Sequence, residues 1–501
     1  MAENVSANNR IYTRRRGVLM PIFSLPSRYG VGTIGQAAYD FIDALSDNGA
    51  SIWAILPTGV TGFGDSPYQS FSSFALNPYF LDLELLIDEG LLTLEECDAC
   101  DFGSDPAAVD YGLLYRNRMP LLMTAYARAR EREGFAEAMA EFESSASWLE
   151  DYAVFMALKD VMGGKPWYEW DEGLKMRSPA AMEDIMPKIA CEVGFHKFIQ
   201  MKLSVQWSRL TDYALQKGVL IMGDMPIYCA YDSADCWAYR ENFRFDKHGR
   251  PKEVAGVPPD YFCEDGQLWG NPVYNWYWMK KEGFSFWLAR LKRAAELYDV
   301  LRIDHFRGFA SYYAVPADAE TARHGVWRRA EGRRLFERAE EERLPLEIVA
   351  EDLGFITGDV KRLLRDTGFA GMQVMEFAFD ADPDNPHKNR RWDGDAKKLR
   401  NKIAYTGTHD NPPIAAWWEE QDETTREFAK EYAGNTELPW GIVKATAECD
   451  ARFVVIPAQD VLLLGAEARI NSPGTASGNW TWRLKQEQMK PLAEGIHKLF
   501  D

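Results

Sequence analysis

Short apolar segments alternate with longer helical patterns along almost the whole 501-residue chain. Strands that alternate with helices are typical of a parallel sheet, because each helix returns the chain to the same edge of the sheet. Eight such units predict an α/β protein with a closed (β/α)8 barrel, the TIM barrel. The expected strands lie near residues 18, 52, 219, 300, 346, 372, 402 and 461.

Two connections are much longer than the others and predict insertions after the second and third strands. Residues 81–194 are rich in Ala, Glu, Leu and Met, so we expect an inserted helical subdomain there. Residues 229–282 form the second inserted connection. No linker, low-complexity tract or fixed-period repeat divides the chain. We therefore interpret residues 1–501 as a single barrel with long, mainly helical insertions.

Some element boundaries follow from apolar runs and charge pairs. A strand is expected from Met372 to Phe377, and the last strand from Val461 to Leu464. The Arg and Glu pairs between Val326 and Arg343 predict a helix, and residues 414–450 also have a helical pattern.

Acidic side chains stand where four of the expected strands end: Asp224, Asp304, Glu351 and Asp410. A buried strand tolerates charges only at its end, and in a parallel barrel that end is the catalytic face. Arg302 lies two residues before Asp304, so we expect its positive charge to keep Asp304 ionised. A structural ion pair at a strand end is the alternative interpretation of Arg302 and Asp304.

Acids that lie close together repel each other, so their pKa values separate and one of them can stay protonated as a general acid. Glycoside chemistry needs this division between a nucleophile and an acid/base. A divalent-metal site is the rival interpretation, because clustered Asp and Glu also bind magnesium. Arg302 and His409 oppose a cation there, and the seven histidines include no H-E-x-x-H pattern, so we predict no metal.

Residues 256–272 combine glycines, the stiff pair Pro258-Pro259 and three aromatic residues, which are Tyr261, Phe262 and Trp269. This composition favours a lid over a cleft, with an ordered surface loop as the alternative. Residues 62–79 form another long loop, which follows the second strand.

The composition excludes several classes of partner. A net charge of −19 argues against nucleic acid and anionic membrane surfaces. The seven scattered cysteines, the lack of an apolar signal core and the lack of a membrane-length apolar run favour a cytoplasmic protein. Residues 30–35 match G-x-G-x-x-G, but no acidic residue ends the next strand to bind a ribose, so nucleotide binding is rejected.

Motifs in family order along nearly the whole chain resemble those of the 4-α-glucanotransferases, the amylomaltase or disproportionating enzymes of the wider α-amylase clan. The resembling stretches are Gly64-Asp-Ser-Pro-Tyr-Gln-Ser, Gly223-Asp-Met-Pro-Ile, residues 256–272, Leu301-Arg-Ile-Asp-His-Phe-Arg-Gly, Ala350-Glu-Asp-Leu-Gly, Thr408-His-Asp-Asn, Asn471-Ser-Pro-Gly and Asn479-Trp-Thr-Trp.

The resemblance implies that Asp304 is the nucleophile and Glu351 the acid/base, while Asp410 binds sugar hydroxyls and helps distort the ring. It implies transfer of α-1,4-glucan segments between maltooligosaccharides through a covalent glucosyl-enzyme, without a cofactor. The implied substrate-binding residues are Tyr68, Asp224, Arg302, His409, Asp65, Ser66, Gln267, Trp269 and Asn471.

Two alternatives stay open beside transfer. The same residues suit a hydrolytic α-glucanase, and a catalytically inactive barrel could bind glucan alone. The sequence also leaves open what Cys229, Cys236 and Cys263 do near these loops.

Overall fold

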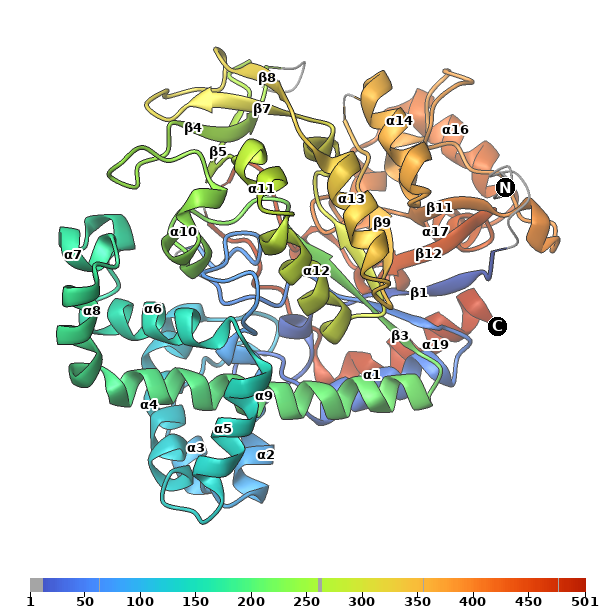
Figure 1. Ribbon diagram of the computed structural model, residues 1–501. Coiled ribbons are helices and arrows are strands. Elements are labelled where there is room, and N and C mark those ends of the chain that lie inside the picture. The colour runs from blue at the N-terminus through green and yellow to red at the C-terminus, as the bar shows by residue number, and fades with distance from the viewer. Residues whose placement is uncertain (1–11, 63, 260–263, 355, 476) are drawn as a thin grey trace.

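The structure is a computed structural model that describes residues 12–62, 64–259, 264–354, 356–475 and 477–501 (Figure 1). Eight parallel strands form one sheet in the order β10-β11-β12-β1-β2-β3-β6-β9. A parallel bridge between Val349 and Ala370 joins the two end strands, β9 and β10, so the sheet closes into the expected (β/α)8 barrel. Its strands are β1 (Arg15–Leu19), β2 (Ile52–Ala54), β3 (Leu220–Met225), β6 (Val300–Ile303), β9 (Glu347–Ala350), β10 (Gly371–Val374), β11 (Arg400–Tyr405) and β12 (Ala451–Pro457).

The eighth strand lies earlier in the chain than predicted. The branched run Val454-Val-Ile456 forms the buried centre of β12, and Pro457 ends it. The apolar residues Val461 to Leu464, expected to be this strand, instead end α18 and form the turn after it, where Leu463 has a positive φ of 52°. The sixth strand is also shorter than expected, because a 3₁₀ helix, η8 (Met375–Phe377), follows Val374.

Helices surround the barrel and turn apolar faces toward it. On α13, for example, Leu335 and Phe336 are buried while the Arg and Glu side chains face solvent. These helices are α1 (Gln36–Ser46), α9 (Ala190–Gln216), α12 (Ser285–Leu297), α13 (Gly332–Glu341), α14 (Gly358–Thr367), α15 (Ile414–Glu420), α16 (Glu423–Ala433), α17 (Trp440–Ala447), α18 (Ala458–Val461) and α19 (Met489–Phe500).

The connection from β2 to β3 holds seven further helices, which lie together at the lower left of Figure 1. Local side-chain caps define several of their starts; the Asp82, Asp110 and Ser178 side chains each accept a backbone N–H of the first turn. The long helix α9 then runs from this region back to the barrel (Figure 1). The seven helices are α2 (Leu83–Asp88), α3 (Leu94–Asp98), α4 (Tyr111–Ala129), α5 (Phe135–Ser145), α6 (Leu149–Val161), α7 (Glu172–Lys175) and α8 (Pro179–Ile185).

A second, antiparallel sheet lies at the top of Figure 1 and has the order β5-β4-β7-β8. Its strands are β4 (Glu253–Val257), β5 (Gln267–Pro272), β7 (Ser311–Pro316) and β8 (Val326–Arg329). The helix expected from Val326 is therefore wrong at its start, where Trp327 of β8 pairs with Tyr313 of β7 and the two rings pack at a tilt, with centroids 5.3 Å apart. Strands β4 and β5 pair with each other and contain the two ends of the predicted lid, residues 256–272. Tyr261, Phe262 and Cys263 lie outside the described residues. Two short helices, α10 (Ala234–Ala238) and α11 (Trp276–Lys281), lie in the same inserted connection.

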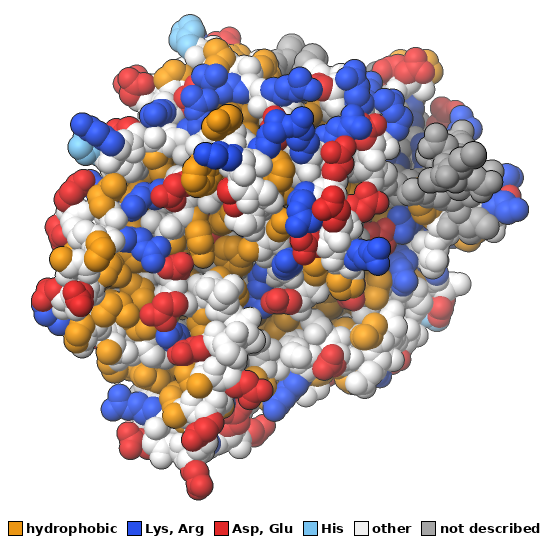
Figure 2. All heavy atoms as spheres, viewed as in Figure 1, with side chains coloured by type: hydrophobic (Ala, Val, Ile, Leu, Met, Phe, Trp, Pro, Cys, Tyr) orange, Lys and Arg blue, Asp and Glu red, His pale blue; other side chains and the backbone are white. Residues whose placement is uncertain are grey.

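Charged and apolar side chains are unevenly spread over the molecule. In the view of Figure 2, Lys and Arg gather along the top, while hydrophobic side chains are prominent at the lower left, over the inserted helices. Among the described residues, no helix combines the length and the apolar character needed to cross a membrane.

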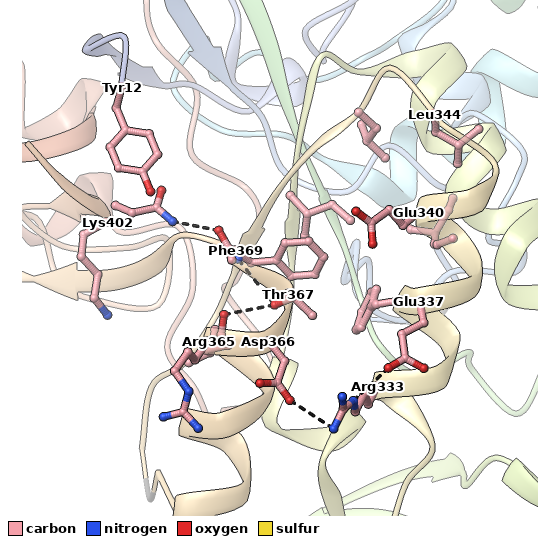
Figure 3. Close-up of a pocket in the computed structure, with 18 of the residues that line it drawn as sticks. Tyr12, Arg333, Glu337, Glu340, Leu344, Arg365, Asp366, Thr367, Phe369 and Lys402 are labelled. Carbon is pink, nitrogen blue, oxygen red and sulfur yellow. Dashed lines mark hydrogen bonds and ion pairs between the residues drawn. The ribbon is translucent and has the colours of Figure 1, made fainter. Parts of the chain in front are cut away.

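A cavity of about 790 Å³ lies between α13 and α14, where residues just before or early in β9, β10 and β11 line it. Arg333 on α13 forms ion pairs there with Glu337 at 2.9 Å and with Asp366 at 3.5 Å (Figure 3). Because these residues stand at the N-terminal ends of the strands, the cavity lies at the end of the barrel opposite the four strand-end acids.

Candidate active site

The four predicted acids lie at the C-terminal ends of their strands. Asp224 is the second-last residue of β3 and pairs in register with Arg302 of β6. Asp304 directly follows β6, Glu351 directly follows β9, and Asp410 lies in the loop after β11. Since all these strands are parallel, the acids meet at one mouth of the barrel.

Arg302 is the cation at the centre of this site and is 8% exposed. Its Nη1 donates to Asp224 Oδ2 at 2.6 Å, and its Nη2 lies 3.2 Å from Glu351 Oε2. Asp304 Oδ1 is farther away, at 3.4 Å from both Nη1 and Nη2. The buried guanidinium of Arg302 therefore contacts three carboxyl groups, and its shortest contact is with Asp224.

Asp304 and Glu351 meet on the same guanidinium, because Arg302 lies 3.4 Å from Asp304 Oδ1 and 3.2 Å from Glu351 Oε2. Burial and the charge of Glu351 raise the pKa of Asp304 well above its ordinary value, although Arg302 opposes the shift. Burial also acts to raise the pKa of Glu351, but Arg302, Asp304 and the N–H of His305 outweigh it and bring the pKa below its ordinary value. The two carboxyl groups therefore titrate as a pair, and together they hold one proton at neutral pH. Arg302 acts to keep Asp304 ionised, as expected, while burial and Glu351 act against it.

His305 is a site residue that the sequence interpretation missed. It adopts a left-handed φ of 49°, which turns its backbone N–H toward Glu351 Oε2 at 2.6 Å. Burial lowers the pKa of His305 to about 4, so its ring is neutral at pH 7. The only local signal was its place directly after Asp304 at a strand end.

Tyr68 connects the loop after β2 to this mouth. Its hydroxyl donates to Asp224 Oδ2 at 2.7 Å, and its ring stacks on His409 at 5.0 Å and an interplanar angle of 17°. Trp480, which the sequence interpretation did not select, contacts both rings from the side, at 5.8 Å and 5.9 Å. One face of Tyr68 is thus already covered by His409.

Asp410 is the most accessible of the four acids, with 46% of its side chain exposed. Asn471 Nδ2 donates to Asp410 Oδ1 at 2.6 Å, and His409 Nε2 lies 3.3 Å from the same oxygen. The backbone N–H of Asn471 also donates to the carbonyl of His409 at 3.1 Å. Asn471 and the loop after β11 therefore hold Asp410 from two sides.

The hairpin of β4 and β5 reaches the site through Trp269. Its indole ring meets His305 edge to face at 4.7 Å. Its Nε1 donates to Gln267 Oε1 at 3.1 Å, and Gln267 itself is exposed. The structure therefore brings Trp269, with Gln267 beside it, to the catalytic mouth.

A family model described as 4-alpha-glucanotransferase matches residues 20–489. The chain belongs to the 4-α-glucanotransferase family. A 4-α-glucanotransferase of Thermus thermophilus is 44% identical over 492 residues, which cover 95% of this chain and 96% of the relative. One of Streptococcus pneumoniae is 41% identical over 489 residues, which cover 96% and 95%.

A solved structure of an amylomaltase from Streptococcus agalactiae in complex with acarbose is similar over 98% of this chain and 100% of that chain, with a TM-score of 0.92 at 37% identity. An amylomaltase from Corynebacterium glutamicum shares the fold, with a TM-score of 0.77 at 18% identity over 97% of this chain and 75% of that chain. The chain is accordingly an enzyme of the 4-α-glucanotransferase type, as its motifs indicated.

Two of the selected residues of this glucanotransferase lie apart from the acid network. Asp65 has a positive φ of 56°, and burial raises its pKa to about 6 beside the hydroxyls of Tyr79 and Tyr111. Ser66 Oγ accepts the backbone N–H of Tyr68 at 3.3 Å. Among the described residues, Ser66 therefore reaches the network only through Tyr68, and Asp65 makes no hydrogen bond or ion pair with it.

Cys229 and Cys236 are buried free thiols. Cys229 Sγ contacts Ser73 Oγ at 3.4 Å and Tyr274 Oη at 3.6 Å. Burial raises the pKa of Cys229 to about 11, so the thiol stays protonated and unreactive at neutral pH. Cys263 lies outside the described residues.

Proposed function

We propose that this chain moves α-1,4-glucan segments between maltooligosaccharides by a retaining double displacement, with Asp304 as nucleophile and Glu351 as acid/base. The observation that carries the proposal is that these two carboxyl groups lie on one guanidinium, with Asp304 Oδ1 at 3.4 Å and Glu351 Oε2 at 3.2 Å from Arg302. Retaining enzymes need two closely spaced carboxyls, whereas inverting enzymes keep theirs ~6.5–9.5 Å apart to admit a water.

The shared proton gives this pair the number of protons that the first step requires. The first step needs an ionised nucleophile and a protonated acid, so the two carboxyl groups together must hold one proton. When the oxygen of a glycosidic bond lies beside Glu351, the shared proton is on Glu351. Asp304 is then the carboxylate that Arg302 stabilises.

The first displacement forms a bond between Asp304 and the anomeric carbon and breaks the bond from that carbon to the leaving oxygen. Glu351 gives its proton to the leaving oxygen. In the second displacement, Glu351 takes the proton of the 4-hydroxyl of an acceptor glucan. That oxygen attacks the anomeric carbon, and the ester to Asp304 breaks.

The surrounding residues suit donor binding. Asp224 Oδ1 is buried without a hydrogen-bond partner among the described residues, so it can accept a sugar hydroxyl. Asp410, held by Asn471 and His409, presents an exposed carboxylate for further hydroxyls and for ring distortion. Tyr68 has one ring face on His409 and offers its other side to the sugar.

Transfer must compete with water, which is present at ~55 M, so the acceptor has to be bound before the ester is attacked. We assign the hairpin of β4 and β5 to this task, with Trp269 and Gln267 contacting the acceptor. Asp65 and Ser66, on the loop after β2, complete the proposed acceptor path. In this proposal the hairpin acts as the lid over the acceptor.

Incubation with maltotriose alone tests the proposal. We expect glucose and longer oligomers to appear together while the total of reducing ends stays constant, because each cleavage is matched by a new bond. A steady rise in reducing ends would show a hydrolase instead. Maltotriose that binds but is not converted would show a glucan-binding barrel without catalysis.

A further inference from the structure

Two buried carboxyl groups lie beneath the loop that contains His409 and Asp410. This loop, residues 406–413, joins β11 to α15. Glu376 lies in η8, directly after β10, and Asp460 lies in α18, directly after β12. Since β10 and β12 are the two neighbours of β11 in the sheet, each supplies one carboxyl to the same loop.

Asp460 joins the two ends of the loop. Its Oδ2 accepts the hydroxyl of Thr406 at the end of β11, and its Oδ1 accepts the backbone N–H of Ile414 at 2.7 Å. Ile414 is the first residue of α15, so the second bond also satisfies a free helix N–H. Asp460 is 1% exposed. The span of the loop is therefore fixed at both ends by one side chain.

Glu376 holds the middle of the loop through Asn411. Glu376 Oε2 accepts Asn411 Nδ2 at 2.8 Å, and Asn411 Oδ1 accepts the N–H and the hydroxyl of Thr408 at 2.9 Å and 2.8 Å. Thr408 Oγ1 in turn accepts the N–H of Asp410 at 3.3 Å. The chain of hydrogen bonds therefore runs from a buried carboxyl to the backbone of Asp410.

The fit between Glu376 and the loop is close. A Cβ placed on Gly407 would lie 2.7 Å from Glu376 Oε1, so a larger residue there would push against the carboxyl. Glu376 is 7% exposed, and its backbone N–H donates to the carbonyl of Thr406 at 3.1 Å. Main chain and side chain of Glu376 thus both contact this loop.

Only one oxygen of Glu376 has a hydrogen-bond partner, because Oε1 is buried without one among the described residues. An ionised carboxylate in that position would be costly. Burial and the charge of Asp460 raise the pKa of Glu376 well above its ordinary value; Glu420 acts in the same direction, while Asn411 and Arg469 oppose the shift. Arg469 itself donates to the carbonyl of Asp410 at 2.8 Å. The neutral acid is the form that fits.

We propose that Glu376 is a positioning residue of the transfer reaction, which acts through Asn411 to fix Asp410 and His409 against the donor sugar. The proposal rests on the proposed function, in which Asp410 binds sugar hydroxyls. It requires that the side chain at position 376 place an acceptor oxygen within hydrogen-bond distance of Asn411 and carry no negative charge. Glutamine meets both requirements, and methionine has a similar size but lacks the acceptor.

The test compares Glu376→Gln with Glu376→Met, using maltotriose as substrate and acarbose as a binding probe. At pH 6 we expect the glutamine variant to stay within about 3-fold of the wild type in kcat/KM. The methionine variant should lose roughly 100-fold, a loss typical of a misplaced reacting group, and should bind acarbose more weakly. Its thermal midpoint must lie above the assay temperature.

The pH profile separates positioning from a purely structural role. As pH rises through the raised pKa, wild-type Glu376 becomes a carboxylate beside Asp460, so wild-type activity should fall at alkaline pH. The glutamine variant cannot ionise and should keep its activity to higher pH, with an unchanged acidic limb. Asp235→Asn is the matched control, because it also removes a buried carboxyl, one that accepts the N–H of Ser73 at 2.8 Å; it should leave the alkaline limb unchanged.

Asn411→Ala supplies a second route if the methionine variant does not fold. It breaks the same chain of hydrogen bonds from the loop side, and it should reproduce the loss in kcat/KM and the weaker acarbose binding. The double variant with Glu376→Met should lose little more activity than either single variant, because both changes break the same hydrogen bond between residues 376 and 411.

The positioning role is overturned if Glu376→Met, or Asn411→Ala where the methionine variant does not fold, has wild-type kcat/KM below its thermal midpoint. It is also overturned if Glu376→Gln is as impaired as Glu376→Met, or if its alkaline limb matches that of the wild type. A failure of the proposed function would show in another variant. In that case Asp304→Asn would retain transfer activity, whatever the result for the Glu376 variants.

Discussion

Asp460 offers a prediction about stability whose sign and size follow from its burial. Its pKa rises from 3.8 to about 7 because burial penalises the charged form. Below pH 4 the group is protonated in both the folded and the unfolded state and contributes no pH dependence. Between about pH 4 and pH 7 the unfolded chain loses the proton while the folded chain keeps it. Folding stability therefore decreases as pH rises through this window.

The size of this loss follows from the shift of about three pKa units. At ~1.4 kcal/mol per unit, the wild type should lose up to about 4 kcal/mol of unfolding free energy from this group between pH 4 and pH 8. Asp460→Asn does not titrate, and its amide oxygen can still accept the N–H of Ile414. Relative to the wild type, the variant should gain stability steadily as pH rises.

Urea unfolding of both proteins at pH 5, 6, 7 and 8 measures the difference. Asp43→Asn is an informative control, because hydrogen bonds from Lys217 and Tyr213 lower the pKa of Asp43. Asp43 is ionised in both the folded and the unfolded state from pH 5 to pH 8, so the difference between this variant and the wild type should stay constant over the range measured. A constant difference between wild type and Asp460→Asn across this pH range would show that Asp460 is already ionised in the folded protein, and the argument from burial would be refuted.

Three further predictions concern the catalytic mouth. Arg302→Met should abolish transfer and lower the thermal midpoint, because Asp224, Asp304 and Glu351 would lose their common cation. Removing one partner of a buried ion pair costs about 3–5 kcal/mol of stability. An unchanged thermal midpoint would contradict the central role of Arg302. Trp269→Ala should weaken acceptor binding by ~1–2 kcal/mol and so raise the ratio of hydrolysis to transfer. Free reducing ends measure hydrolysis, and the redistribution of oligomer lengths measures transfer. An equal loss of both activities would assign Trp269 to donor binding or to the fold. Dialysis against a strong chelator should leave rate and thermal midpoint unchanged, and activity restored only by added calcium or magnesium would overturn the metal-free account.

The barrel and its acids could be predicted because both depend on local patterns. Asp224, Asp304 and Glu351 each lie at the end of a short apolar run, and a parallel sheet brings such ends together without further information. The eighth strand was misplaced because Val461-Leu-Leu-Leu464 is as apolar as a strand. Its true position depends on the pairing of β12 with β1 and β11, which are distant in sequence.

Features that depend on distant contacts were missed. Strand β8 forms only because Trp327 pairs with β7, whereas its own Arg-rich sequence suits a helix. Glu376 was hidden inside a strand expected to run to Phe377, so its place at a strand end was not apparent. The coupling of Asp304 to Glu351 could not be predicted, because Arg302 is the neighbour of Asp304 in sequence while Glu351 is 47 positions farther along the chain.

The central claim is that Asp304 forms a covalent bond to the sugar, and trapping that bond tests it most directly. In Glu351→Gln, α-maltosyl fluoride should still react, because fluoride leaves without a proton, but the ester should persist because no base activates the acceptor. Mass spectrometry of the digested protein should then find the maltosyl group on the peptide that contains Asp304, and Asp304→Asn should retain less than about a thousandth of wild-type transfer, a loss of ~4 kcal/mol. A sugar attached to another residue, or an Asp304→Asn variant above that level, would contradict the account.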